Sequence, residues 1–521
     1  MPNYAFNLKH GKLLDTIESN ERYMNNLYRN KVLLTGDASV VEKYYKEDFT
    51  LFETQYAQSA HVGTFWHNVG KKNARVMFGL MKMINDAFVR LVTAGGIEVS
   101  VLNNEEETTK DTERLNNILE ENSFKDKLLG LAESYASGLG FAPFKVNYDT
   151  DIKNVPLIEV VDPFKTEAIT QRGFIKGFKF KKREKYHDME FEVQEIWYMN
   201  DGEPILEYKV FDTKAQNPIE KDIFKLDKDI VSALGLEFVI ENGESVFRDY
   251  TKLKDLPVVL KNNTPYNSAF PKSPFGEADT EQLDNIEDSL SELLSAMVEE
   301  VRKGRIKVMI SDDLISKDEN GHAKEFDDFK LDYEIVKANQ AEGSTGIEVV
   351  QGEINTEKYL SGIAQLIMYG CNKANIHPVT VGITGVESIV SSQESQVERE
   401  KVSLRTREMK VRSWRMVLQE LFERVLQVDD IMNKRSVGEY DIQVEFGEFT
   451  NPSPESVVGL LGKSIETGVM SMKKAQKQYF GDNIQEEELE KMYLQTLVEK
   501  GMPLTETQRT RYELLTGEEP E

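Results

Sequence analysis

Cysteine is almost absent from this chain of 521 residues, which contains only Cys371. A single thiol cannot form a disulfide within the chain, and its place on the apolar face of a predicted helix indicates a packed side chain rather than a nucleophile. The N-terminal segment has no apolar run typical of secretory signals, and no stretch approaches the roughly 20 apolar residues that cross a bilayer. We therefore expect a soluble protein of a reducing cytoplasm.

Motifs that carry chemistry are also missing. The six histidines are scattered, and none forms the HExxH pattern of a zinc site. The chain has no GxxxxGKS or GxxxxGKT loop for nucleotide phosphates and no GxSxG nucleophile turn. Triplets such as Asp212-Thr213-Lys214 occur, but 90 acidic and 64 basic residues produce them by chance. The sequence predicts no catalytic residue, no metal and no cofactor.

Positive charge is in short supply, since the formal net charge is −26. Affinity for nucleic acid comes from cation contacts with phosphates and from counterion release, so we expect that any DNA partner is held weakly. A hydrophobic content of 40% and an aromatic content of 9% are those of a folded protein. The length is sufficient for several domains.

The first 270 residues predict a mixed helical and β-stranded domain. Short helices are expected in residues 1–60, and apolar residues at helical spacing predict longer helices at 71–92 and 111–137. Residues 262–276 contain several Asn, Ser and Pro residues, which predicts a linker. Alternating patterns predict strands in IEVSVL, FAPFKVNYD, VPLIEVVD, FIKGFKFKKR, FEVQEIWYM and ILEYKVF.

The second half is organised around helices. Two amphipathic helices, residues 277–303 and 355–376, bracket a small β-rich insert made of RIKVMI, FKLDYEIV and GIEVVQG. Pro378 prevents the second helix from continuing, and a loop of β-branched residues and glycines follows it. Beyond a very long helix, EYDIQVEFGEF predicts a strand that returns to an earlier sheet, and helices are expected at 454–467, 471–479 and 485–500.

The very long helix is predicted by a heptad pattern. Trp414, Leu421 and Val428 add to its apolar seam, whereas polar residues take the equivalent positions in the front half, so we expect the front half to be more solvated. The seam itself consists of six apolar residues spaced seven apart along about 40 residues: Val390, Val397, Leu404, Val411, Leu418 and Val425.

The front of this helix is locally cationic. Its basic side chains could form a solvated face with i,i+4 ion pairs, or they could contact phosphates or the acids of an adjacent subunit, and their spacing does not separate these alternatives. They are Arg399, Lys401, Arg405, Arg407, Lys410, Arg412 and Arg415.

This order of elements resembles the portal proteins of tailed bacteriophages, particularly those of phages with Gram-positive hosts. The resemblance is carried by SPFGEADTEQLDNIEDSLSELLSAMVEEVRKGRIKVMI, by NIHPVTVGITGVESIVSSQESQVEREKVSLRTREMKVRSWRMVLQELFERVL and by TGVMSMKKAQKQYFGDNIQEEELEKM. It implies an α+β fold with a wing, a two-helix stem, a small α/β clip, a long kinked helix and a helical crown. The implied parts are the wing with an N-terminal helical extension (1–270), stem helix 1 (271–303), clip (304–353), stem helix 2 (354–376), tunnel loop (377–392), long wing helix (393–430), returning wing strand (431–452) and crown (453–521).

The resemblance also implies a function. A portal protein is a non-enzymatic homo-oligomer of about twelve subunits, which forms a ring at one capsid vertex of the virion after assembly in the host cytoplasm. The ring would be the conduit for double-stranded DNA during packaging and ejection. Expected partners are that DNA, the terminase large subunit, a head-completion or adaptor protein of the head-tail connector, and the major capsid and scaffolding proteins, with no membrane.

In such a ring, the uncharged loop after Pro378 would project into the channel, where it could touch DNA without gripping it. Rival interpretations are another ring-forming virion adaptor or scaffold and a DNA-processing enzyme. Candidate contacts with DNA or with a neighbouring subunit are Arg399, Lys401 and Arg405. The residues expected to face DNA are Thr380, Val381, Ile383, Thr384, Val386, Glu387 and Ser388.

Overall fold

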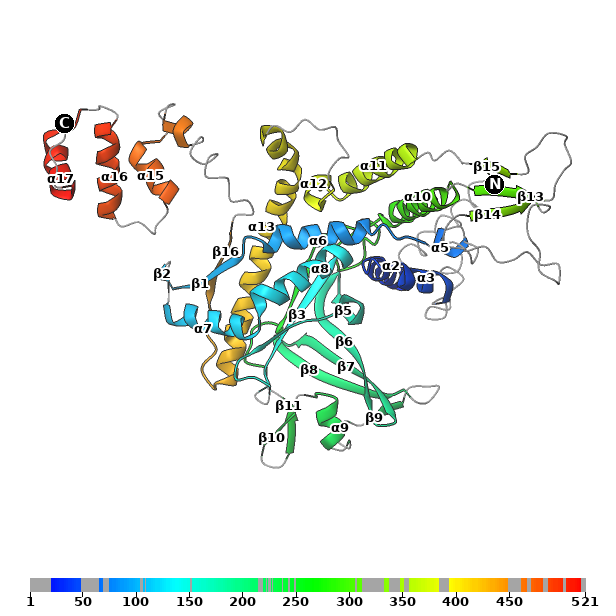
Figure 1. Ribbon diagram of the computed structural model, residues 1–521. Coiled ribbons are helices and arrows are strands. Elements are labelled where there is room, and N and C mark those ends of the chain that lie inside the picture. Colours follow the sequence, from blue (N-terminus) through cyan, green and yellow to red (C-terminus); the bar gives the residue numbers. More distant parts are fainter. Residues whose placement is uncertain are drawn as a thin grey trace, which may run out of the picture. The chain divides into compact units, whose positions relative to one another are not determined.

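The computed structural model divides into two units, Met1–Gly447 and Glu448–Glu521, whose elements are labelled in Figure 1. It describes residues 20–47, 65–68, 75–103, 106–107, 109–149, 152–213, 219–221, 223, 226, 228–236, 238–241, 244–247, 250–304, 307–311, 332–336, 347–350, 356–383, 393–447, 461–465, 470–480, 486–499 and 503–516. Within these ranges the chain is an α+β protein, as expected.

The helices of the larger unit fall into an N-terminal group, a group that packs on sheets, and the helices of the second half. They are α2 (Asn20–Leu33), α3 (Ala38–Glu47), α5 (Phe65–Asn68), α6 (Leu80–Thr93), α7 (Thr109–Glu121), α8 (Leu129–Leu139), α9 (Lys228–Ala233), α10 (Asp284–Lys303), α11 (Thr356–Lys373), α12 (Pro378–Val381) and α13 (Gln393–Met432).

In the part of the chain that the structure describes, the strands form five small sheets, all but one of them wholly antiparallel. In spatial order they are β16 (Asp441–Phe446), β1 (Ile97–Asn103) and β2 (Glu106–Glu107); β12 (Val258–Asn262), β3 (Phe141–Asn147) and β4 (Leu157–Val160); β5 (Thr166–Gln171), β6 (Phe174–Tyr186), β7 (Met189–Asn200), β8 (Glu203–Asp212) and β9 (Ile219–Lys221); β10 (Phe238–Glu241) and β11 (Glu244–Phe247); and β14 (Asp332–Val336), β13 (Lys307–Ser311) and β15 (Ile347–Val350).

The β-rich insert between the two predicted helices is confirmed. Its central strand β13 pairs in parallel with β14 and antiparallel with β15. The flanking helices α10 and α11 pack against each other. Gly370 lets α11 lie close to α6, because a Cβ at this position would stand 2.7 Å from the Leu80 side chain.

The main hydrophobic core is built around the back half of α13, as the heptad pattern predicts. Trp414, Leu418, Leu421 and Val425 are fully buried, at 0% exposure. They belong to one cluster with residues of β1, β3, β16, α7 and α8. Burying large side chains of this kind contributes about 1.5–3 kcal/mol each, so tertiary packing holds α13 in place.

The returning strand is also confirmed, because β16 pairs antiparallel with β1 from Ile97↔Phe446 to Leu102↔Asp441. β16 lies at the edge of its sheet, where backbone carbonyls without a partner strand can pair with a strand of another chain. Side chains of α13 satisfy two of these carbonyls: Arg415 Nε donates to Val444 O at 3.0 Å, and Gln419 Nε2 donates to Ile442 O at 2.8 Å.

Three predicted helix boundaries are wrong. The helix expected from residue 71 begins at Leu80, since the preceding amides bond to α10 instead; Val76 N, for example, donates to Ser295 Oγ at 3.0 Å. The pattern at 111–137 is split into α7 and α8, with Ser123 in a left-handed conformation at φ 50°. The helix expected from residue 277 begins at Asp284.

Residues 262–276 are a packed segment, and the prediction of a linker is wrong. The Phe275 ring stacks on Phe141 with centroids 3.8 Å apart. Asn267 is buried, accepts from Phe270 N at 2.8 Å and donates to Gly276 O at 3.1 Å. The polar residues that suggested a linker therefore satisfy the backbone of a fixed turn, and its aromatic residues anchor it.

The smaller unit is helical where the structure describes it. Residues 461–465 are helical, and α15 (Met472–Phe480), α16 (Glu486–Glu499) and α17 (Glu506–Thr516) follow. The predicted helices at 471–479 and 485–500 are confirmed, whereas α17 was not expected. Across the described parts of both units, no helix has the length and apolar character needed to span a membrane.

Candidate DNA-facing segment and its anchoring

The segment expected to face DNA begins at α12. The α11 helix stops near Asn375, which adopts a left-handed conformation at φ 53°. His377 then caps α12: its Nδ1 accepts from Val379 N at 3.3 Å, and Pro378 takes the first helical position. Gly382 ends α12 at φ 91°, a conformation that favours glycine. Both ends of this single helical turn are therefore specified locally.

Hydrogen bonds from α13 anchor this turn. Ser403 is buried, and its Oγ accepts from His377 N and from Thr380 Oγ1, both at 2.9 Å. One turn further along, Thr406 Oγ1 donates to Asn375 O at 2.8 Å. Because Gln393 begins α13 ten residues before Ser403, the front of α13 extends roughly 15 Å beyond this anchor at 1.5 Å per residue.

Two of the residues predicted to face DNA, Val381 and Thr380, contact other parts of the subunit in the structure. Val381 is only 4% exposed, since α12 packs against α6, so the expectation that Val381 faces a channel is wrong. The Thr380 hydroxyl is engaged by Ser403. Ile383, at the end of α12, is half-buried. Four further candidates lie outside the described residues and stay predictions: Thr384, Val386, Glu387 and Ser388.

Several cations of α13 are used inside the subunit. Arg407 donates from Nε to Leu91 O at 2.7 Å and from Nη2 to Gly447 O at 2.6 Å. Lys410 is buried, and Arg415 bonds the edge strand. These three side chains therefore bond within the subunit, a role that the alternatives drawn from the sequence did not include. Of the residues predicted to contact DNA or a neighbouring subunit, Lys401 and Arg405 are exposed, and the side chain of Arg399 lies outside the described part.

Lys410 is the centre of a buried polar cluster. Its Nζ lies 2.9 Å from Glu133 Oε1, 2.6 Å from Asp279 Oδ2 and 2.7 Å from Asn263 Oδ1. Trp414 Nε1 donates to the other carboxylate oxygen of Glu133 at 2.6 Å. The cluster ties α13 to α8 and to the approach to α10, so the long helix and the helix before the β insert share one ionic anchor.

Burial and charge act in opposite directions in this cluster. Burial alone would lower the pKa of Lys410, but the carboxylates of Asp279 and Glu133 outweigh it and hold the pKa above its usual value. Lys261 lies over the Trp414 ring at 5.2 Å. Burial lowers the pKa of Lys261 to about 8, because the attraction of Glu133 offsets only part of the desolvation. The sequence offered no signal for this pairing.

A second buried carboxylate joins α10 to α6. Glu287 Oε1 accepts from Gly79 N at 2.7 Å, and Oε2 accepts from Met81 N at 3.1 Å. These amides open α6, so Glu287 satisfies free donors and complements the positive end of the helix dipole. Burial raises the pKa of Glu287, although the two backbone donors oppose the rise.

The far end of α13 is held by an ionic cluster with α7. Arg114 lies 3.2 Å from Asp429 and 3.2 Å from Asp430. Tyr440, just before β16, donates to Asp430 Oδ2 at 2.6 Å and accepts from Arg114 Nη2 at 3.1 Å. Together with the Ser403 and Lys410 contacts, this cluster fixes α13 at its middle and at its end.

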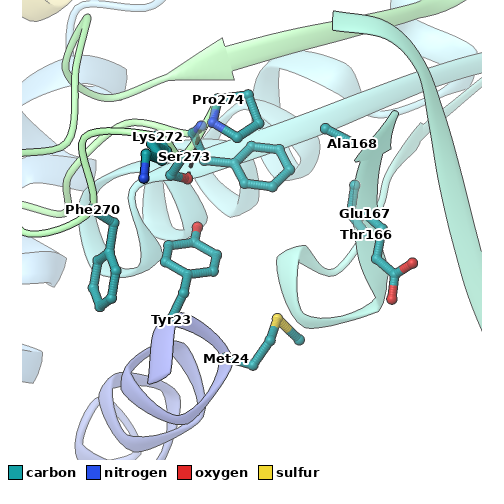
Figure 2. Close-up of a pocket in the computed structure, with 10 residues that line it drawn as sticks. Tyr23, Met24, Thr166, Glu167, Ala168, Phe270, Lys272, Ser273 and Pro274 are labelled. Atoms are coloured by element: carbon teal, nitrogen blue, oxygen red, sulfur yellow. Dashed lines mark hydrogen bonds between the residues drawn. The ribbon is translucent and has the colours of Figure 1, made fainter. Parts of the chain in front are cut away.

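Figure 2 shows a pocket of about 260 Å³ between α2, β5 and the packed segment 262–276. Tyr23 lies against Phe270 with ring centroids 5.2 Å apart, and burial raises its pKa. Glu167 is paired with Lys179 at 3.3 Å and with Lys181. These lysines outweigh burial and lower the pKa of Glu167, which makes it a poor general acid at neutral pH.

No group of three or more His, Cys, Asp or Glu side chains is arranged to hold a metal ion in the described ranges. Cys371 is buried, and burial raises the pKa of its thiol to about 12. A thiol of this kind is an inert packing residue.

Comparison with known proteins identifies the class. The family model described as "Phage portal protein, SPP1 Gp6-like" matches residues 9–496. The chain belongs to this family of phage portal proteins, as the order of its elements suggested. No curated protein matches the chain. It is similar to a solved structure described as "Neck of empty GTA particle computed with C6 symmetry", with 9% identity, 82% of this chain and 90% of that chain covered, and a TM-score of 0.34.

Proposed function

We propose that this protein forms a closed ring at a capsid vertex of the virion and serves as a non-enzymatic conduit for double-stranded DNA. Membership of the phage portal family over residues 9–496 is the observation that carries this proposal. Packaging and ejection would pass through the ring. The terminase large subunit, a head-completion protein, and the capsid and scaffolding proteins would be its partners.

The anchoring of α12 supports a DNA-facing role for residues 384–388. The chain enters this stretch at Ile383, directly after a turn fixed by Ser403, and leaves it into the front of α13. A segment that lines a channel needs a fixed point of attachment, and the Ser403 bonds fix the turn that precedes this one. In this arrangement Thr380 and Val381 are supports, and Thr384 and Val386 are the candidates for contact.

Charge supports transit rather than storage. A net charge of −26 per subunit repels phosphate, and an uncharged Thr and Val tip adds no counterion-release affinity. DNA in such a channel can slide, because few ion pairs must break as it moves. The same physics disfavours tight nucleic-acid binding of the kind that a DNA-processing enzyme needs.

Negative-stain images of the purified protein test the ring directly. The expected result is an annulus with a central hole wide enough for a duplex, of about a dozen subunits by native mass spectrometry. Particles that remain monomeric at all concentrations and salts tested would contradict the proposal.

A charge added to the loop tests which residues face DNA. Val386→Lys should increase the affinity of rings for duplex DNA and its salt dependence, by about one unit in the slope of log affinity against log salt for each lysine that reaches a phosphate. Val386→Thr is the matched control, because it changes the same side chain without adding charge and should leave the slope unchanged. An unchanged slope for Val386→Lys would show that residues 384–388 do not face DNA in the channel.

A further inference from the structure

The outward side of α13 carries a row of exposed apolar residues. Val402 is 48% exposed, Met409 is 65% exposed and Met416 is 62% exposed. They are spaced seven residues apart, so they lie in line over roughly 21 Å of helix. This row lies opposite the buried seam of Val411 and Leu418. A single exposed apolar residue needs no explanation, but an aligned row marks an interaction surface.

Two arginines lie within this row. Arg405 and Arg412 are exposed and occupy positions between the apolar residues, at spacings of three and four. We call these five residues the Met–Arg stripe: Val402, Arg405, Met409, Arg412 and Met416. Methionine and arginine are enriched at protein–protein interfaces. Phosphates of DNA offer nothing to three apolar side chains, so the stripe fits a protein surface that presents carboxylates and tolerates apolar contact.

The chain exposes a surface of that kind on the outer face of the β1–β16 pair. The alternation along β16 buries Ile442 and Val444 and exposes Asp441 and Glu445. Glu98 of β1, also exposed, lies directly opposite Glu445. Like charges opposite one another across a strand pair destabilise the sheet, and a cation from outside would relieve this repulsion.

The outer face of β1–β16 lacks such a cation within the subunit. No ion pair joins Glu98, Asp441 or Glu445 to a cation among the described residues. The exposed carboxylates of β16, Asp441 and Glu445, are four residues apart, which is roughly 13 Å along a strand. Arg405 and Arg412 are separated by roughly 10 Å along α13. The two surfaces are therefore opposite in charge, and the spacings of their charged residues are similar, roughly 10 Å on α13 and roughly 13 Å on β16.

We propose that the Met–Arg stripe of one subunit docks on the outer face of the β1–β16 pair of a second copy of this chain. This inference rests on the proposed ring. A closed ring with more than two subunits needs two different, complementary faces on each subunit. The arginines pair with Asp441 and Glu445 of the neighbour, and the methionines cover the strand surface between these two carboxylates.

Thiol protection tests the stripe. Cys371 is buried and is the sole cysteine, so Met409→Cys introduces the one accessible thiol. Its rate of labelling by a maleimide is compared between monomers and rings separated by size. We expect labelling at least about tenfold slower in rings, since a buried interface excludes the reagent. Ile152→Cys, also 65% exposed, is the matched control and should label equally in both states.

Each other outcome overturns the inference. Equal rates in monomers and rings would show that the stripe stays open. Slow labelling in the monomer would show that the same chain covers it. Protection in rings only after duplex DNA is added would make it a DNA contact. If native mass spectrometry finds no ring, both the proposed function and this inference fail; a ring with an unprotected thiol defeats the inference alone.

Charge reversal tests the partner face. Arg405→Glu with Arg412→Glu should lower ring yield at least about tenfold, because like charges then meet across the interface. Asp441→Lys with Glu445→Lys should do the same, and all four changes together should restore ring formation. Arg172→Glu, on the β5–β6 turn, is the exposed control. Failure of the four-fold variant to recover would exclude the β1–β16 face as the partner.

Discussion

Two rows of apolar residues run along opposite sides of α13 with the same seven-residue spacing. Val411, Leu418 and Val425 are at most 8% exposed, whereas Met409 and Met416 are more than 60% exposed. Both rows satisfy the pattern of a packed helix face. The difference teaches that periodicity reveals a face suited to burial but does not say what buries it. The inner row is buried by the subunit itself, and we assign the outer row to a neighbour.

The charged residues on the two sides of α13 also differ in burial. Lys410 on the inner side is enclosed by Glu133 and Asp279, whereas Arg412, only two residues away, is exposed. A buried charge that loses its partner is costly, and a surface charge contributes little. Four predictions test this contrast within one subunit, so they are best measured under conditions that keep the chain monomeric.

The largest expected effect is that of Lys410→Met. Methionine has nearly the same side-chain volume as lysine but no charge, so Glu133 and Asp279 lose their buried cation. This loss should lower the free energy of unfolding by about 3–5 kcal/mol. Urea unfolding followed by tryptophan fluorescence measures this loss. Arg412→Met, the exposed control, should change stability by less than about 0.5 kcal/mol. Equal effects for the two variants would break the comparison between the two sides of the helix.

Truncation of apolar residues gives the next largest contrast. Leu418→Ala should cost about 2–5 kcal/mol, because it leaves a cavity in a fully packed core. Met416→Ala removes a side chain that is 62% exposed and should cost less than about 0.5 kcal/mol in the monomer. Denaturant midpoints of the two variants, measured side by side, test the difference. A similar loss for Met416→Ala would mean that the subunit itself buries the outer row.

The pH dependence of stability tests the inner cluster. The pKa of Lys261 falls from 10.5 to about 8 on folding. Below pH 8 the folded state holds a buried, charged Lys261, which destabilises it. Between pH 8 and 10.5 the folded state has lost this proton while the unfolded state still binds it, so stability rises with pH. Relative to Lys261→Met, the free energy of unfolding of the wild-type chain should therefore increase by up to about 3 kcal/mol between pH 8 and 10.5. Unfolding titrations at several pH values measure this gain. Parallel curves for the two proteins would contradict it.

The smallest predicted effect concerns the base of the DNA-facing segment. Ser403→Ala removes the acceptor of His377 N–H and of the Thr380 hydroxyl, which should cost about 1–3 kcal/mol, mostly as local opening. Hydrogen exchange should then be faster in residues 377–383. Ser413→Ala on the same helix is the control. Unchanged exchange in Ser403→Ala would show that other contacts hold α12.

Much of the architecture could be predicted from local patterns. Alternation in IEVSVL and EYDIQVEFGEF predicted β1 and β16, and the heptad pattern predicted the buried half of α13, because side-chain periodicity is a property of the segment itself. Errors occurred where distant partners decide the outcome. The amide of Val76 bonds Ser295 of α10 rather than its own turn, and Phe275 stacks on Phe141, which turned a supposed linker into a packed segment.

The candidate segment shows the same division. Pro378 indicated where α11 must stop, since its backbone preference acts locally. The helical turn α12 between Pro378 and Gly382 was not expected, because the sequence predicted a loop there. The β-branched Val381 was expected at the tip of a loop, but α12 packs against α6 and buries this side chain. The role of Ser403 carried no sequence signal, because an isolated serine in a long helix is unremarkable until the elements that pack against it are known.

The sequence by itself determined the strong acidity, the lack of catalytic motifs, the long helix and the order of elements shared with portal proteins, because these depend on composition and short-range spacing. Only the tertiary structure decided which cations point inward, which apolar row is covered, and where the segment after Pro378 is anchored. Burial and charge pairing depend on residues far apart in the chain: Lys410 needs Glu133 and Asp279 to be buried at low cost, and no local pattern brings these three together.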